Sequence, residues 1–182
     1  MQLKQNTFHN INKFFTNQEC EDIIEFAMDF GEKFNYNSEE TWDCRRIYDL
    51  VFKEKIYLKL SEVLELSKTK NMDNINVSLT RYYDNRFLDL HLDKTSSLTT
   101  VIVLTENFHD GRFILSESSE LISKNKKMNL YDLKIGEGIT FIGNECYHGV
   151  MPVSEGLRCA LNIWINDDGY EFTRFKKEKT LL

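Results

Sequence analysis

Three residues with metal-binding side chains stand close together in the segment Leu88-Asp89-Leu90-His91-Leu92-Asp93. In an extended strand alternate side chains share a face, so Asp89, His91 and Asp93 are expected on one face and the leucines on the other. An imidazole and a carboxylate arranged in this way can bind one metal ion. A histidine from elsewhere would complete a facial triad, which suits Fe(II) and oxygen chemistry. The tripeptide His91-Leu92-Asp93 alone also occurs often by chance.

The third ligand would have to come from one of the other histidines. His9 precedes the first expected helix, and His109 lies in a turn-like segment before Asp110-Gly111, where a solvated histidine is the favoured interpretation. His148 remains as the candidate. Asp89 is a weaker candidate, because it would lie about 7 Å along the strand from His91, on the far side from Asp93. It could instead support a ligating histidine or contact a substrate.

Arg158 lies on a segment that is expected to be a strand over residues 157–165. We expect the turn Ser154-Glu155-Gly156 to fold the strand after His148 back onto this segment, so that the two strands pair. One face of the second strand would carry Arg158 with small, polar and indole side chains (Ala160, Asn162, Trp164). An arginine near a metal can form two parallel hydrogen bonds to a carboxylate. A surface salt bridge is the alternative, and Trp164 could equally belong to the core.

The elements that must position these residues follow from the patterning of the chain. Thr16-Asn17-Gln18-Glu19 is a capping box before an amphipathic run that ends at Gly31, and a second helical run covers Ile56 to Leu66. From Asn74 onward the chain is rich in β-branched residues and glycine turns, with strands expected over 75–80, 99–105, 112–116, 138–142 and 157–165. Helices followed by short strands predict an α+β domain with a β-sandwich or barrel.

Composition limits the function classes. The chain has 182 residues and a formal net charge of -6, which disfavours broad, charge-driven binding to nucleic acid. It lacks an apolar leader and any run of about 18 apolar residues, so we expect a cytoplasmic protein without membrane contact. Four scattered cysteines, with no C-x-x-C pair, are expected to be reduced and individually packed (Cys20, Cys44, Cys146, Cys159).

Several segments together resemble the iron(II)- and 2-oxoglutarate-dependent dioxygenases, particularly the prolyl 4-hydroxylase-like branch. In chain order they are Arg81-Tyr82 before Phe87-Leu88, His91-Leu92-Asp93, Gly136-Glu137-Gly138-Ile139-Thr140-Phe141, His148-Gly149-Val150-Met151-Pro152-Val153, and Gly156-Leu157-Arg158-Cys159-Ala160-Leu161-Asn162-Ile163-Trp164. The resemblance implies a double-stranded β-helix, or jelly roll, with the N-terminal helices packed on one sheet. A single oxygenase domain would span residues 1–182, with mainly helical support over 1–73 and the jelly-roll core over 74–167.

The resemblance also implies roles for individual residues. Two histidines and one aspartate would bind Fe(II) (His91, Asp93, His148), and Arg158 would pair with the distal carboxylate of 2-oxoglutarate. Tyr82 and Asn162 are expected in the cosubstrate pocket. Three further residues are expected in the substrate pocket (Trp164, Asp89, Arg112).

The chain departs from the family pattern at three places. Asn85 replaces a glycine, which requires a left-handed conformation there. Gly111-Arg112 replaces a double glycine, and Val103 replaces a tyrosine that hydrogen-bonds the distal carboxylate in many prolyl hydroxylases. The polar segments 36–46 and 117–128 are expected to act as lids over the site.

The implied activity is hydroxylation of a C–H bond coupled to decarboxylation of 2-oxoglutarate, with O2 as second cosubstrate, succinate and CO2 as coproducts, and ascorbate as reductant. A prolyl residue of a peptide or protein is the leading substrate, and a free amino acid or another small molecule is the alternative. Demethylation of nucleic-acid bases is disfavoured by the acidity of the chain. A catalytically inert jelly-roll binding module is the non-enzymatic alternative. The sequence does not predict the oligomeric state.

Overall fold

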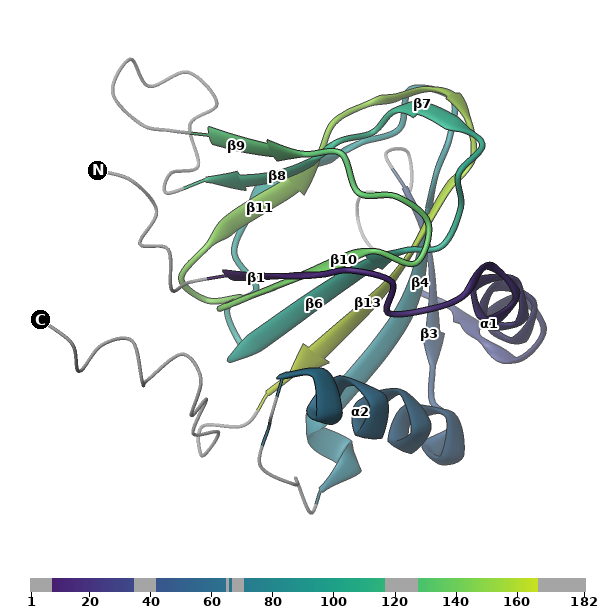
Figure 1. Ribbon diagram of the computed structural model, residues 1–182, viewed down its shortest axis with the longest axis vertical. Helices are drawn as coiled ribbons and strands as arrows, with labels where there is room; N and C mark the ends of the chain where they lie inside the picture. Colours follow the sequence, from purple (N-terminus) through teal and green to yellow (C-terminus); the bar gives the residue numbers. More distant parts are fainter. Residues whose placement is uncertain (1–7, 35–41, 65, 67–70, 117–127, 167–182) are drawn as a thin grey trace, which may run out of the picture.

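A seven-stranded antiparallel sheet, here called the large sheet, forms the centre of the molecule (Figure 1). This computed structural model describes residues 8–34, 42–64, 66, 71–116 and 128–166. The strand order is β1-β10-β6-β13-β4-β3-β2. The bounds are β1 Phe8–Ile11, β2 Glu32–Lys33, β3 Asp43–Ile47, β4 Ile75–Tyr82, β6 Leu98–Val103, β10 Gly138–Phe141 and β13 Arg158–Ile165.

A smaller, four-stranded sheet packs against one face of the large sheet. Its order is β5-β11-β8-β9, with β5 Leu88–His91, β8 Phe113–Ser116, β9 Met128–Tyr131 and β11 Tyr147–Val150. A two-stranded sheet pairs β7 (Phe108–Asp110) with β12 (Val153–Gly156). Apolar side chains from both main sheets form the core between them, among them Val101 and Phe141 from one and Phe113 and Val150 from the other. This sandwich confirms the α+β jelly-roll prediction.

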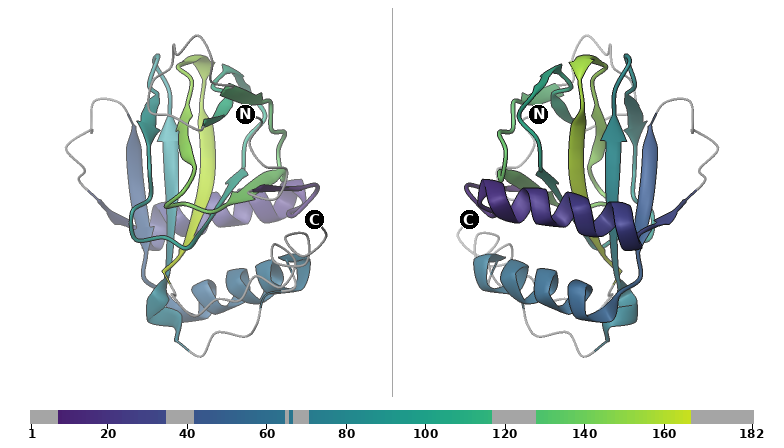
Figure 2. Two further views of the ribbon diagram at one scale, coloured as in Figure 1. Left: turned by 90° about the vertical axis from the view of Figure 1, so that its left-hand side faces the viewer. Right: turned by 90° about the vertical axis from the view of Figure 1, so that its right-hand side faces the viewer.

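Two helices cover the opposite face of the large sheet, α1 (Asn17–Phe30) and α2 (Leu50–Leu64), and a short 3-10 helix, η1 (Met72–Asn74), leads into β4 (Figure 2). They pack on buried sheet residues that include Val77, Leu79 and Leu161. The prediction that the N-terminal helices pack on one sheet is therefore confirmed, and this layer supports the sheet that carries Arg158.

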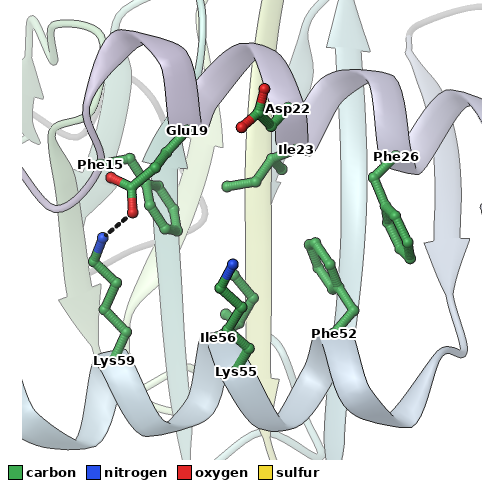
Figure 3. A pocket seen from close by; sticks show the side chains of 9 residues that line it. All are labelled: Phe15, Glu19, Asp22, Ile23, Phe26, Phe52, Lys55, Ile56 and Lys59. Carbon is green, nitrogen blue, oxygen red and sulfur yellow. Dashed lines mark hydrogen bonds and ion pairs between the residues drawn. The ribbon is translucent and has the colours of Figure 1, made fainter.

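The predicted capping box at the start of α1 is present. The Thr16 hydroxyl accepts a hydrogen bond from the Glu19 amide at 3.2 Å, and the Glu19 carboxylate accepts one from the Thr16 amide at 2.8 Å. Glu19 also pairs with Lys59 of α2 at 2.7 Å, beside a seam in which Phe26 and Phe52 stack with ring centroids 4.6 Å apart (Figure 3). These contacts fix the two helices to each other.

The N-terminal part of the chain contributes strands as well as helices. β1 pairs with β10 at one edge of the large sheet, and β2 and β3 extend the other edge next to β4. The expected lid over 36–46 is wrong where it overlaps Asp43–Ile47, because these residues pair with β4. β3 has the polar sequence Asp-Cys-Arg-Arg-Ile, which does not predict a β-strand. Residues 35–41 and 117–127 lie outside the described residues.

The predicted hairpin between the strand after His148 and residues 157–165 is wrong. β11 pairs with β5 and β8 in the small sheet, whereas β13 pairs with β4 and β6 in the large sheet. Ser154–Gly156 belong to β12, which pairs with β7. The segment therefore carries the chain from one sheet to the other, as jelly-roll connections do, instead of turning it back within one sheet.

Two other predictions concern the environment of the chain. All four cysteines are free and buried, as expected for individually packed thiols. Among the described residues, the helices are too short or too polar for a membrane span.

Candidate metal and cosubstrate site

Two histidines meet across neighbouring strands of the small sheet. His91 ends β5 and is the direct register partner of His148 in β11, and their ring centroids lie 4.2 Å apart. The Asp93 carboxylate lies between them, with Oδ1 at 3.6 Å from His91 Nε2 and Oδ2 at 3.3 Å from His148 Nε2. One ligand atom from each of the three residues lies within 4.8 Å of the other two. The structure thus brings together the three predicted ligands.

A β-bulge explains how β5 presents its histidine. The register with β11 shifts between the pairs His91–His148 and Leu88–Val150, so β5 has one residue more than its partner. The alternation is therefore broken, and Leu88 lines the same cavity as His91 while Asp89 is exposed. The prediction that Asp89 shares a face with His91 is wrong for this reason. β5 also ends at His91, so Asp93 lies beyond the strand.

Backbone carbonyls orient both imidazoles. His91 Nδ1 lies 2.9 Å from the Asp89 carbonyl, and His148 Nδ1 lies 3.1 Å from the Cys146 carbonyl. A carbonyl can only accept, so each Nδ1 carries a proton. Each Nε2 faces Asp93: without a metal it can carry a second proton and donate to the carboxylate, and with that proton removed it offers a lone pair to a metal ion. This is the tautomer that a metal-binding histidine needs. Asp89 thus contributes to the site through its backbone.

The Asp93 carboxylate is held by two further side chains from the large sheet. The Thr99 hydroxyl donates to Oδ2 at 2.7 Å, and the Trp164 indole N–H donates to the same oxygen at 2.8 Å. The Asp93 amide also donates to the Gly143 carbonyl at 3.0 Å. A Cβ on Gly143 would lie 2.4 Å from Thr99 Oγ1, so only glycine fits this close approach. Trp164 was expected in the substrate pocket, and Thr99 was not predicted.

Electrostatics favour an ionised carboxylate between the histidines. Burial alone would raise the pKa of Asp93, but hydrogen bonds with His148 and His91, the His148 charge and the Thr99 hydroxyl together lower it well below its usual range. Burial would lower the pKa of His91, but the hydrogen bonds with Asp93 and the Asp89 carbonyl outweigh it and raise that pKa. An ionised Asp93 is the form that binds a cation.

A cavity of about 200 Å³ extends from these residues between the two sheets. Its lining includes the three predicted ligands and four more of the residues predicted for the site (Tyr82, Arg158, Asn162, Trp164). Asn162 donates from Nδ2 to the Thr80 hydroxyl at 2.9 Å, so its amide is fixed against the wall. Arg112 is exposed and is not among the lining residues, so its predicted place in the pocket is wrong.

Arg158 is a buried cation that faces this cavity. Only 1% of the residue is exposed, and its Nη1 atom has no hydrogen-bond partner among the described residues. Its guanidinium carbon lies 5.5 Å from the ring centre of Tyr82 and 6.0 Å from that of Phe108. Burial lowers the pKa of Arg158, and burial raises that of Tyr82 to about 12. A buried guanidinium with an unpaired donor is a strong site for a carboxylate.

Three other sequence features can be located in the structure. Asn85 has φ of 63°, the left-handed conformation that the sequence predicts at this position. Val103 is buried opposite Ala160 and is not among the residues that line the cavity. His109 is largely exposed, 3.9 Å from Glu155, in agreement with a solvated histidine.

The residues of the site fit a ferrous ion and a dicarboxylic acid. Two imidazole nitrogens and one carboxylate are the ligands of the facial triad that leaves metal positions open. Because both Nδ1 atoms are hydrogen-bonded to backbone carbonyls, the Nε2 atoms are the ones available to the metal. The unpaired donor of Arg158 lies in the wall of the same cavity. A molecule with two carboxylates could therefore contact the metal site and Arg158 together.

Comparison with known proteins identifies the fold. No protein-family model and no curated protein matches the sequence. Among solved structures, a prolyl-4-hydroxylase from Pseudomonas putida is 14% identical, with 91% of this chain and 95% of that chain covered and a TM-score of 0.64. A viral collagen prolyl hydroxylase from Paramecium Bursaria Chlorella virus-1, in complex with 2-oxoglutarate, is 18% identical, with coverages of 91% and 98% and a TM-score of 0.65.

A third similar structure is a prolyl hydroxylase from Trichoplax adhaerens in complex with a hypoxia inducible factor oxygen degradation domain peptide fragment. It is 13% identical, with 99% of this chain and 89% of that chain covered and a TM-score of 0.62. The chain therefore has the fold of the prolyl 4-hydroxylase-like 2-oxoglutarate and Fe(II) oxygenases, which is the fold that the sequence motifs predict.

Proposed function

We propose that the protein is an Fe(II)- and 2-oxoglutarate-dependent dioxygenase that hydroxylates a prolyl residue of a peptide or protein. The observation that carries the proposal is the buried guanidinium of Arg158, whose Nη1 has no hydrogen-bond partner among the described residues, in the cavity that the His91, Asp93 and His148 side chains also line. Burying an unpaired charge costs several kcal/mol unless a bound anion compensates for it. A dicarboxylate cosubstrate would supply that anion.

Each group has a definite role in this proposal. His91, Asp93 and His148 would hold the iron, and Arg158 would fix the distal carboxylate of 2-oxoglutarate. Bound iron would supply oxygen activation coupled to decarboxylation of the cosubstrate to succinate and CO2. Thr99 and Trp164 orient the Asp93 carboxylate, and the apolar walls of Tyr82 and Phe113 exclude water from the cavity. Ascorbate is proposed as the reductant.

The prolyl substrate is supported by the similar structures, three of which are prolyl hydroxylases, one of them in complex with a peptide. The test is to incubate the protein with Fe(II), ascorbate and labelled 2-oxoglutarate, with and without proline-containing peptides. Succinate that rises with these peptides, together with a peptide mass increased by one oxygen, is the expected result. Succinate that rises only with free amino acids would move the activity to small molecules. No succinate with any substrate would indicate an inert binding module.

A further inference from the structure

A second pocket adjoins the cavity at the edge of the large sheet. It measures about 220 Å³, and Trp42 lines both it and the cavity. The two also share a floor, because Thr80 in β4 lines the cavity and its register partner Cys44 in β3 lines the second pocket. Register partners carry their side chains on the same face of a sheet. The second pocket is thus a lateral extension of the cavity.

The charge of this pocket is opposite to that of the whole chain. Lys33 and Arg86 line it, in a chain whose formal net charge is -6. Among the described residues of the lining, Asp43 is the one carboxylate, and its Oδ2 is paired with Arg81. Cations concentrated beside a cavity in an acidic protein attract an anionic partner.

Nearby groups leave this excess of positive charge in place. Arg46 lies over the Phe34 ring at 4.3 Å, and its register partner is the acidic residue Glu32. Asp84 is exposed in the turn between Tyr82 and Arg86, outside the pocket lining. Within the part of the chain that the structure describes, Lys33 and Arg86 are therefore the two lining cations available to a ligand in the pocket.

The walls of the pocket are aromatic. Phe34, Trp42 and Tyr83 line it, and the Arg86 guanidinium carbon lies 4.0 Å from the centre of the Tyr83 ring. A guanidinium held on a ring keeps the edge of its fork available for a carboxylate. Aromatic walls with two cations suit an aliphatic side chain that ends in a carboxylate, such as glutamate, on an extended peptide.

We infer that this pocket, defined by Lys33, Trp42, Tyr83 and Arg86, selects substrates with an acidic side chain close to the residue that is oxidised in the cavity. The inference rests on the proposed function, because it takes the cavity as the place of oxidation. A peptide would place the target residue in the cavity and its acidic neighbour across Trp42 in the pocket. Selection would then come from charge pairing rather than from the shape of the cavity.

The test compares two labelled peptides with one central proline, flanked on both sides by glutamate in one and by glutamine in the other. Binding is measured by fluorescence anisotropy under anaerobic conditions, with Mn(II) and 2-oxoglutarate present. We expect the glutamate peptide to bind roughly tenfold more tightly, with a preference that shrinks as salt is added. Equal affinities, or tighter binding of a single-stranded oligonucleotide than of either peptide, would overturn the inference.

Charge-reversal variants assign the preference to the pocket. Lys33→Glu with Arg86→Glu should abolish it, and the single Lys33→Glu change, at an exposed residue, should reduce it without affecting folding. Arg112→Glu, at an exposed arginine outside both linings, is the matched control and should preserve the preference. An equal loss in the control would show a general charge effect and contradict the inference. Binding of 2-oxoglutarate is measured in the same samples. If 2-oxoglutarate does not bind, the proposed function fails. If 2-oxoglutarate binds but the two peptides bind equally, only this inference fails.

Discussion

The two faces of strand β13 differ in what they contribute. Cys159, Leu161 and Ile163 point to the helix-covered face and belong to the apolar core there. Arg158 and Trp164 point the other way and line the cavity. Apolar burial on the first face stabilises the folded protein. The second face buries a guanidinium whose Nη1 donor has no partner among the described residues, which is unfavourable. One strand thus combines a stabilising face with a face whose cost is compensated only when an anion binds.

The largest effect is expected on the helix-covered face. Leu161→Ala removes a fully buried side chain from the core between the large sheet and the helices, and it should lower the free energy of unfolding by about 2–5 kcal/mol. Urea unfolding measures this loss. The affinity of the folded protein for 2-oxoglutarate should be unchanged. A weakened affinity at unchanged stability would break the distinction between the faces.

On the cavity face, a substitution should change ligand affinity and leave stability unchanged or raised. Arg158→Leu removes the buried cation, so 2-oxoglutarate binding should weaken by about 2–5 kcal/mol, because its carboxylate would lose a buried charge partner. The free energy of unfolding without ligand should stay the same or rise, since the cost of burying the guanidinium disappears. Calorimetric titration and urea unfolding of the same variant provide both values. A strongly destabilised variant that binds 2-oxoglutarate normally would assign Arg158 to the core.

A smaller effect is expected from the hydroxyl that supports Asp93. Thr99→Val keeps the shape of the side chain but removes the donor to Asp93 Oδ2, and it should weaken Fe(II) or Mn(II) binding by about 10–100-fold. Thr99→Ser restores the donor and should restore the affinity. The readout is metal titration in the absence of 2-oxoglutarate. Equal affinity in the valine and serine variants would show that the hydroxyl does not position the ligand.

The smallest effect concerns the helix layer at low pH. Hydrogen bonds from Lys59 and Thr16 lower the pKa of Glu19, so its contribution to stability is present above the unfolded pKa of about 4.3 and is lost as the pH falls through the lower folded value. The partly exposed pair with Lys59 is screened by solvent, so the loss should be small. Urea unfolding below that pH should show a shallower decline in Glu19→Gln than in wild type. Identical declines would contradict this role.

Local structure was predictable from the sequence where neighbouring residues alone determine the backbone conformation. The capping box at Thr16, the alternating faces of β13 and the left-handed Asn85 all follow from local chemistry. The polar strand β3 does not, because its partners lie about 35 residues away in β4, at a separation that local pattern cannot reveal. The wrong hairpin has the same origin, since Ser154–Gly156 carry turn residues but pair with β7.

Within the site, residue types were more predictable than their surroundings. His91, Asp93 and His148 converge as the motif implies, but the bulge that exposes Asp89 depends on pairing with β11. Thr99 lies in a run of β-branched residues that is typical of any buried strand, and its hydroxyl reaches Asp93 only through the tertiary fold. The exposure of Arg112 likewise follows from the position of β8 rather than from its sequence.

A joint metal and cosubstrate site is tested most directly by equilibrium dialysis of labelled 2-oxoglutarate against the anaerobic protein, with and without Fe(II), for wild type and Asp93→Ala. We expect one molecule of 2-oxoglutarate to bind per protein chain when Fe(II) is present. That binding should be strongly reduced without the metal and in the variant. Absence of binding to wild type, or binding that is indifferent to both Fe(II) and Asp93, would contradict the claim that these side chains and Arg158 form one metal and cosubstrate site.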